Sequence, residues 1–331
     1  MKFKPLLMVL ALGIGTALAG CSSSSANNAS DNKNKKLEVY TTIYPLQDFT
    51  EKIGGKYVEA KSILPTGVDA HSFEPTTKTM VKIANADAFV YSGIGLEGFA
   101  DKAQSTLKNE DVALVEAAKG IELAKSSEDE HAHEDEHAHE EEHVHEDEHA
   151  HEEEHNHGDT DPHVWLDPVL AIQLAENIKD ELVELKPDKK AEFEKNFQAL
   201  KTQLEDVDQK LKTTIGDAPH KEILVSHAAY GYWEKRYGLK QISVAGLSPT
   251  NEPSQKQLEN IVKQAKKDHI KYFIFDQNLK PKVSTLVKNE VGAQALTLHN
   301  LESLTKDDVK NKEDYFSIMQ HNIDTLKKAL Y

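Results

Sequence analysis

The residues of this chain best suited to chemistry form a repeat of histidine and acid. From Glu130 to Asp159 the sequence reads EHAHED EHAHEE EHVHED EHAHEE EHNHGD, five copies of a six-residue unit with two histidines each. Neutral imidazole is a common ligand for zinc, copper and nickel, and short His-rich tracts bind metals. We therefore expect weak, exchangeable metal sites at the ten histidines of the repeat: His131, His133, His137, His139, His143, His145, His149, His151, His155 and His157.

The same tract holds the excess negative charge of the chain. Residues 128–161 contain seventeen Asp and Glu and no Lys or Arg, whereas the formal net charge of the chain is −17. Without those seventeen, the 56 acids fall to 39, which the 39 basic residues balance. The tract is too polar to fold alone, and its charge attracts cations. Because the chain has no basic patch, we expect no nucleic-acid partner.

The N-terminus has the features of a targeting segment. Residues 1–20 join a basic start to an apolar run and predict a secretory signal peptide, whose apolar run is too short for a membrane-spanning helix. The run ends Leu18-Ala19-Gly20-Cys21, which resembles a bacterial lipobox and implies a lipid on Cys21, the only cysteine. Residues 21–36 would be a flexible tether. We expect a protein anchored by lipid to the outer face of the bacterial cell membrane.

Outside these segments, short apolar runs alternate with stretches of helical periodicity. We predict strands at 37–42, 57–64, 87–91 and 112–115, and again at 222–226, 241–246, 272–276 and 294–298. Predicted helices include 76–86, 95–108, 254–267 and 282–291. This alternation predicts an α/β fold of mostly parallel sheets flanked by helices.

One long helix joins the two halves of this pattern. Pro187 suits the first turn of a helix, and apolar residues follow at spacings of 4, 3, 4, 3 and 4. The stripe consists of Phe193, Phe197, Leu200, Leu204, Val207 and Leu211. At 1.5 Å per residue the helix is roughly 40 Å long. We predict an N-terminal lobe at 37–186 that contains the His-rich loop 128–160, a linking helix at 187–215 and a C-terminal lobe at 216–331, with four strands in each lobe.

The predicted parallel sheets bring four residues that are distant in sequence to one predicted metal site. Ligands of open α/β sheets bind beyond the carboxyl ends of the strands, where His71, His163, His227 and Glu302 all fall. Three imidazoles and one carboxylate suit tetrahedral zinc, whereas manganese favours more oxygen ligands. His299 and Asp276 compete for the fourth position. The remaining histidines outside the repeat are interpreted as structural: His220, His269 and His321.

Seven segments carry a resemblance to a known family. They read TTIYPLQDFTEKIGG, GVDAHSFEPT, ADAFVYSGIGLEGF, DPHVWLDP, LVSHAAYGYW, NEPSQKQL and LHNLESL. Together they resemble the zinc-specific solute-binding lipoproteins of bacterial ABC transporters, over nearly the whole chain after the tether. An acidic His-rich insertion before DPHVWLDP is typical of the zinc-binding members.

The resemblance implies a function, a site and a partner. It carries the zinc ligands over to His71, His163 and His227, and in four-ligand members to Glu302, where other members use water. Manganese-binding members have an acid at the position of His227, which favours zinc here. The family fold has two lobes bridged by a rigid helix. The implied role is capture of zinc for a permease driven by an ATPase, by a monomer without the further zinc-binding domain of some relatives.

Two other classes of function remain open at this stage. A zinc hydrolase needs an open water position and a general base, and HExxH patterns occur only inside the acidic repeat, as at residues 133–137. A surface adhesin or metal-storage lipoprotein would need only the loop and the anchor, and would leave the two-lobed body unexplained.

Overall fold

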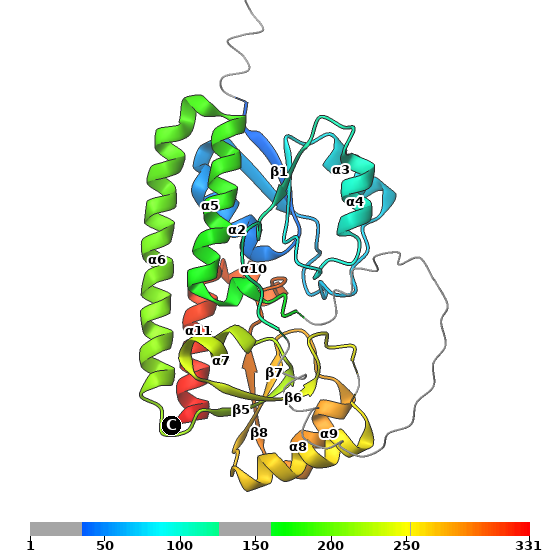
Figure 1. Ribbon diagram of the computed structural model, residues 1–331, viewed down its shortest axis with the longest axis vertical. Helices are drawn as coiled ribbons and strands as arrows, with labels where there is room; N and C mark the ends of the chain where they lie inside the picture. The colour runs from blue at the N-terminus through cyan, green and yellow to red at the C-terminus, as the bar shows by residue number, and fades with distance from the viewer. Residues whose placement is uncertain (1–34, 126–159, 252) are drawn as a thin grey trace, which may run out of the picture. The chain divides into compact units, whose positions relative to one another are not determined.

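The computed structural model describes residues 35–125, 160–251 and 253–331 (Figure 1). Within them, eight strands form two parallel sheets of four, ordered β2-β1-β3-β4 and β6-β5-β7-β8. The strands are β1 (Leu37–Thr41), β2 (Val58–Ser62), β3 (Ala88–Tyr91), β4 (Ala113–Glu116), β5 (Glu222–His227), β6 (Lys240–Ala245), β7 (Tyr272–Asp276) and β8 (Gln294–Leu298). The predicted fold class is confirmed.

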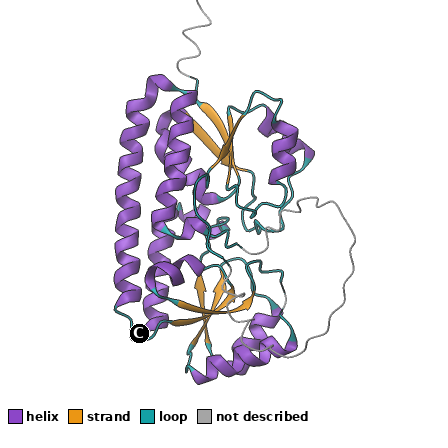
Figure 2. Ribbon diagram, in the orientation of Figure 1, coloured by secondary structure: helices purple, strands orange, loops and turns teal. Residues whose placement is uncertain are grey.

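Helices cover both faces of each sheet (Figure 2). They are α2 (Tyr44–Gly54), α3 (Thr77–Ala84), α4 (Ala100–Leu107), α5 (Pro168–Leu185), α6 (Lys190–Gly216), α7 (Gly231–Tyr237), α8 (Gln255–Lys267), α9 (Lys282–Val291), α10 (Lys306–Asn311) and α11 (Tyr315–Leu330). Phe89 packs with α3 and α4 on one face of the first sheet, and Phe273 packs with α8 and α9 on one face of the second. On their other faces the two sheets share one continuous core.

Helix α6 is the longest element in the described part of the chain, with 27 residues. Its predicted stripe from Phe193 to Leu211 is buried. It packs against α2 and α5 beside the first sheet and against α11 beside the second, so it passes along both (Figure 1). Since residues Lys36–Tyr331 form one compact unit, this shared core places the loops of one sheet beside those of the other.

The predicted helix at 95–108 was wrong at its start, because α4 begins only at Ala100. Gly93 and Gly95 have φ values of +78°, which lie in the left-handed region and interrupt any helix. The Glu97 side chain then ties this loop down. Its Oε1 accepts hydrogen bonds from Thr42 Oγ1 at 2.6 Å and from the Ser92 amide at 2.9 Å.

Several predictions fall outside the described residues. They concern the signal peptide at 1–20, the lipidation of Cys21, the tether and the histidines of the repeat. Lys125 and Thr160 flank residues 126–159, which the structure does not describe. These two residues lie together, since they form an antiparallel bridge. No helix in 35–125, 160–251 or 253–331 is long and apolar enough to cross a bilayer.

Candidate metal centre

The structure brings the four predicted site residues together. His71 lies in the loop after β2, His227 is the last residue of β5, and Glu302 follows β8. His163 directly precedes a short 3₁₀ turn that leads into α5. One ligand atom from each of the four lies within 4.8 Å of the others. The carboxyl ends of parallel strands thus deliver side chains from both sheets to one point.

The segment that carries His163 is fixed by contacts from the second half of the chain. Trp165 Nε1 donates to the Asn300 carbonyl, and the hydroxyl of Tyr315 donates to the Trp165 carbonyl, both at 2.7 Å. Trp233 Nε1 donates to the Leu166 carbonyl at 2.7 Å. All three aromatic side chains are fully buried. The segment therefore has little freedom to move His163 away from the other ligands.

Two buried carboxylates orient two of the imidazoles. Asp161 Oδ1 lies 2.8 Å from His163 Nδ1, and Asp276 Oδ2 lies 2.8 Å from His227 Nδ1. Asp276 ends β7, the neighbour of β5 in the sheet, which brings it beside His227. Carboxylates at this position fix the imidazole tautomer with the proton on Nδ1 and leave Nε2 free to bind a metal.

Glu302 is held by groups from both halves of the chain. Its Oε2 accepts a hydrogen bond from the Ala70 amide at 3.1 Å, and its Oε1 accepts one from Asn300 Nδ2 at 3.0 Å. The Glu302 carbonyl also accepts a hydrogen bond from the Tyr44 amide at 3.0 Å. Leu301 adopts a left-handed φ of +64°, which turns the chain after β8. The carboxylate is thus placed by backbone geometry as well as by its own contacts.

Three buried nitrogen atoms at this point have no hydrogen-bond partner. They are the Nε2 atoms of His71, His163 and His227. Those of His71 and His163 lie 3.5 and 3.9 Å from Glu302 Oε1, too far or too poorly aligned for a hydrogen bond. Buried polar atoms are rarely left unpaired, because the loss of water is then uncompensated. A cation between these atoms would satisfy all three, so the donor set fits a metal ion.

The protonation states at the site also favour a cation. Burial raises the pKa of Glu302, but the three neighbouring imidazoles outweigh it and hold the pKa at about 2. Burial lowers the pKa of His163, although Asp161 opposes this effect. Burial also lowers the pKa of His227, but Asp276 outweighs it and raises the pKa to about 9. A metal ion therefore meets an ionised Glu302 and must displace a proton from His227.

The other histidine and carboxylate candidates have different contacts. His299 accepts a hydrogen bond from the Leu301 amide on Nδ1 and places Nε2 3.1 Å from Asp308, so it is occupied away from the site. Asp276 supports His227 and is not in the four-residue group. The His321 ring is exposed and lies 3.6 Å from Glu313. His321 therefore lies outside the four-residue group.

Sequence reasoning did not single out Asp161, Asn300 or Asp69. Asp161 stands two residues before His163, and the structure makes it the partner of that imidazole. Asp69 stands two residues before His71, and its Oδ1 accepts hydrogen bonds from the Ser72 amide and hydroxyl at 3.1 Å. An acid two residues before a ligand histidine was the available signal in both cases.

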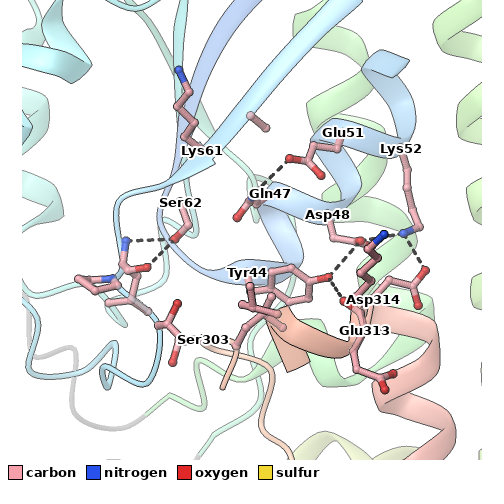
Figure 3. Close-up of a pocket in the computed structure, with 17 residues that line it drawn as sticks. Tyr44, Gln47, Asp48, Glu51, Lys52, Lys61, Ser62, Ser303, Glu313 and Asp314 are labelled. Atoms are coloured by element: carbon pink, nitrogen blue, oxygen red, sulfur yellow. Dashed lines mark hydrogen bonds and ion pairs between the residues drawn. The ribbon is translucent and has the colours of Figure 1, made fainter. Parts of the chain in front are cut away.

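A separate cavity of ≈ 740 Å³ is not the metal site, because none of the four proposed ligands lines it (Figure 3). Its charged lining consists of three lysines and four acids: Lys52, Lys61, Lys312, Asp48, Glu51, Glu313 and Asp314. Lys52 Nζ bridges Asp48 of α2 at 2.7 Å and Asp314, which caps α11, at 2.9 Å. These ion pairs join the two halves of the chain.

Comparison with known proteins gives matches over most of the chain. Residues 39–329 match the ZnuA family, described as zinc-uptake complex component A, periplasmic. The high-affinity zinc uptake system protein ZnuA of Bacillus subtilis (strain 168) is 37% identical over 313 residues, which are 95% of this chain and 93% of that protein.

Two further matches are streptococcal. The zinc-binding lipoprotein AdcA of Streptococcus pneumoniae (strain R6) is 34% identical over 98% of this chain but 61% of its own length, so this chain spans about three fifths of that relative. The crystal structure of the Zn(II)-bound ZnuA-like domain of Streptococcus pneumoniae AdcA superposes with a TM-score of 0.71 at 33% identity. It covers 89% of this chain and 99% of that domain.

Proposed function

Because this chain belongs to the ZnuA family of zinc-uptake components, we propose that it binds one Zn(II) ion outside the cytoplasm and delivers it to an ABC permease. Zinc is then cargo that the protein carries, and no reaction is catalysed. The observation that carries this proposal is the convergence of three unpaired imidazole nitrogens and one ionised carboxylate within 4.8 Å.

The chemistry of the donor set supports zinc as the cargo. His71, His163 and His227 each offer Nε2, and Glu302 offers one oxygen. Three nitrogen ligands and one carboxylate complete a tetrahedral zinc site, whereas a manganese site would use more oxygen. With four protein ligands the site is closed. It leaves no position for the bound water that a zinc hydrolase activates.

The same geometry suggests how the ion is released. His71 belongs to the first half of the chain, and His227 and Glu302 belong to the second. A movement that separates the loops of the two halves would remove ligands from the ion and weaken its binding. We propose that contact with the permease, which an ATPase drives, causes this separation.

The segments outside the described residues have accessory roles in this proposal. The ten histidines of the repeat collect zinc weakly near the membrane and raise its local concentration. A lipid on Cys21 keeps the protein at the outer face of the cell membrane, and residues 22–36 let the body reach the permease. This proposal follows from composition and from the resemblance to lipoproteins.

Single-site variants test the proposed ligands. In competition titrations with a zinc chelator, the His71→Ala, His163→Ala and His227→Ala variants should each lose the tight zinc event. His321→Ala is the matched control, because its imidazole is exposed and it is not one of the four grouped residues. If all three variants keep the tight event, the ligand assignment is wrong. A deletion strain that grows normally under zinc limitation would contradict the uptake role.

A further inference from the structure

The four proposed ligands differ in their access to solvent. The side chains of His163 and His227 are 0% exposed and that of Glu302 is 2% exposed, whereas that of His71 is 10% exposed. The loop that carries His71 contains the exposed residues Pro65, Thr66 and Gly67. Of the four proposed ligands, His71 is therefore the most accessible to a zinc ion from solution.

Asp69 of the same loop lines a small cavity. Its lining includes three carboxylates and three amides, from Asp69, Asp276, Glu302, Gln277, Asn278 and Asn300. Its volume is ≈ 10 Å³, about the space that one water molecule needs. Glu302 belongs both to this lining and to the proposed ligand group, so the cavity adjoins the position of the bound ion.

Asp69 is the carboxylate of this cavity that is nearest to solvent. Its Oδ1 accepts two hydrogen bonds from Ser72 at an exposed position, and the described residues give its Oδ2 no hydrogen bond. One oxygen of Asp69 is thus fixed by Ser72, and the other is available to a cation close to the final site.

We propose that Asp69 is a transient zinc ligand through which the ion enters and leaves the four-residue site. The inference rests on the proposed function and adds a group that the final coordination does not use. A dication that loses all its water at once in a buried passage faces a very large desolvation cost. An oxygen ligand on the route replaces one water of the hydrated ion before Glu302 and the imidazoles replace the others.

This role predicts a kinetic effect without an equilibrium effect. A group that stabilises only the passage lowers the barrier equally in both directions, so its loss slows binding and release by the same factor. The zinc ion in its final position does not contact Asp69. The dissociation constant, which is the ratio of the two rates, therefore stays nearly constant.

The test is stopped-flow measurement of zinc binding and of zinc transfer to a chelator, on the purified full chain. The tight phase is first identified as the one that His163→Ala abolishes. In Asp69→Asn, both rates of this phase should fall about tenfold, and the dissociation constant should change less than about twofold. Asp69→Glu should restore the rates. Asp69→Ser, which keeps an acceptor for the Ser72 amide, is the second variant without a carboxylate.

Glu74→Gln is the matched control, because it removes an exposed carboxylate from the same loop. Equal slowing in Glu74→Gln and Asp69→Asn would mean general attraction of cations and would overturn the proposal. Unchanged rates in both carboxylate-free Asp69 variants would overturn it too. So would faster release with weaker affinity, which would make Asp69 part of the final site. If His163→Ala retains the tight phase, the proposed zinc site itself fails, whatever Asp69 does.

Discussion

The proton on His227 gives the sharpest prediction of this account. Asp276 raises the pKa of His227 to about 9, whereas the ordinary value is 6.5. Because pH 7 lies two units below this pKa, only about one molecule in a hundred has a neutral His227 with a free Nε2. We therefore expect apparent zinc affinity to rise about tenfold per pH unit from pH 7 to 9, and about one proton to leave His227 per zinc bound.

Asp276→Asn separates two effects of the same carboxylate. The variant removes the charge that holds the proton, so burial lowers the pKa of His227 and the hundredfold competition at pH 7 disappears. It also weakens the support of a metal ligand, which costs about 10–100-fold in affinity. Near pH 7 the two effects oppose each other, and the variant should bind zinc within about tenfold of the natural protein. At pH 9 proton competition is nearly absent in the natural protein too, so only the weakened support of His227 remains. The zinc affinity of Asp276→Asn should then be about 10–100-fold lower than that of the natural protein.

The assay is competition titration with a chelator at several pH values, combined with calorimetry in buffers of different ionisation enthalpy to count released protons. Asp161→Asn is the matched control, because it removes the equivalent partner of His163, whose pKa is already low. Its affinity loss should show no such pH dependence. Equal pH slopes in the natural protein and in Asp276→Asn would refute the reasoning about His227.

Three other predictions follow from the structure. In the metal-free protein, protonated His227 stabilises the fold by up to about 3 kcal/mol. This contribution is complete below pH 6.5 and is lost as the pH rises through 9. Urea unfolding across this pH range measures the change in the free energy of unfolding. Leu204→Ala, in the buried stripe of α6, should lower the free energy of unfolding by about 2–5 kcal/mol in the same assay. Deletion of residues 130–157 should remove the weak zinc events in calorimetry and keep the tight one; loss of both would contradict the separate roles.

Much of the fold could be predicted from periodicity alone. The apolar stripe from Phe193 to Leu211 is regular, and α6 buries all of it. Alternating strand and helix patterns likewise led to two sheets of four. The start of α4 could not be predicted in this way. The loop before it is shaped by Gly93 and Gly95 in left-handed conformations and by the buried Glu97, whose partner Thr42 is distant in sequence.

The four site residues could be placed because the ends of parallel strands meet at one edge. Their supporting groups could not. Asp276 was considered as a competing fourth ligand, because the sequence cannot distinguish a carboxylate that binds metal from one that orients an imidazole. The distance of 2.8 Å to His227 Nδ1 makes that distinction. The roles of Asn300 and the Ala70 amide depend on contacts between the two halves, which no local pattern encodes.

The central claim is that one zinc ion sits among His71, His163, His227 and Glu302. Anomalous diffraction at the zinc edge from crystals of the zinc-loaded protein tests it most directly. The account predicts one strong peak at about 2.0–2.2 Å from the three Nε2 atoms and from a Glu302 oxygen. A peak away from these four residues, or its absence from crystals of protein that holds one tight zinc in solution, would contradict the account.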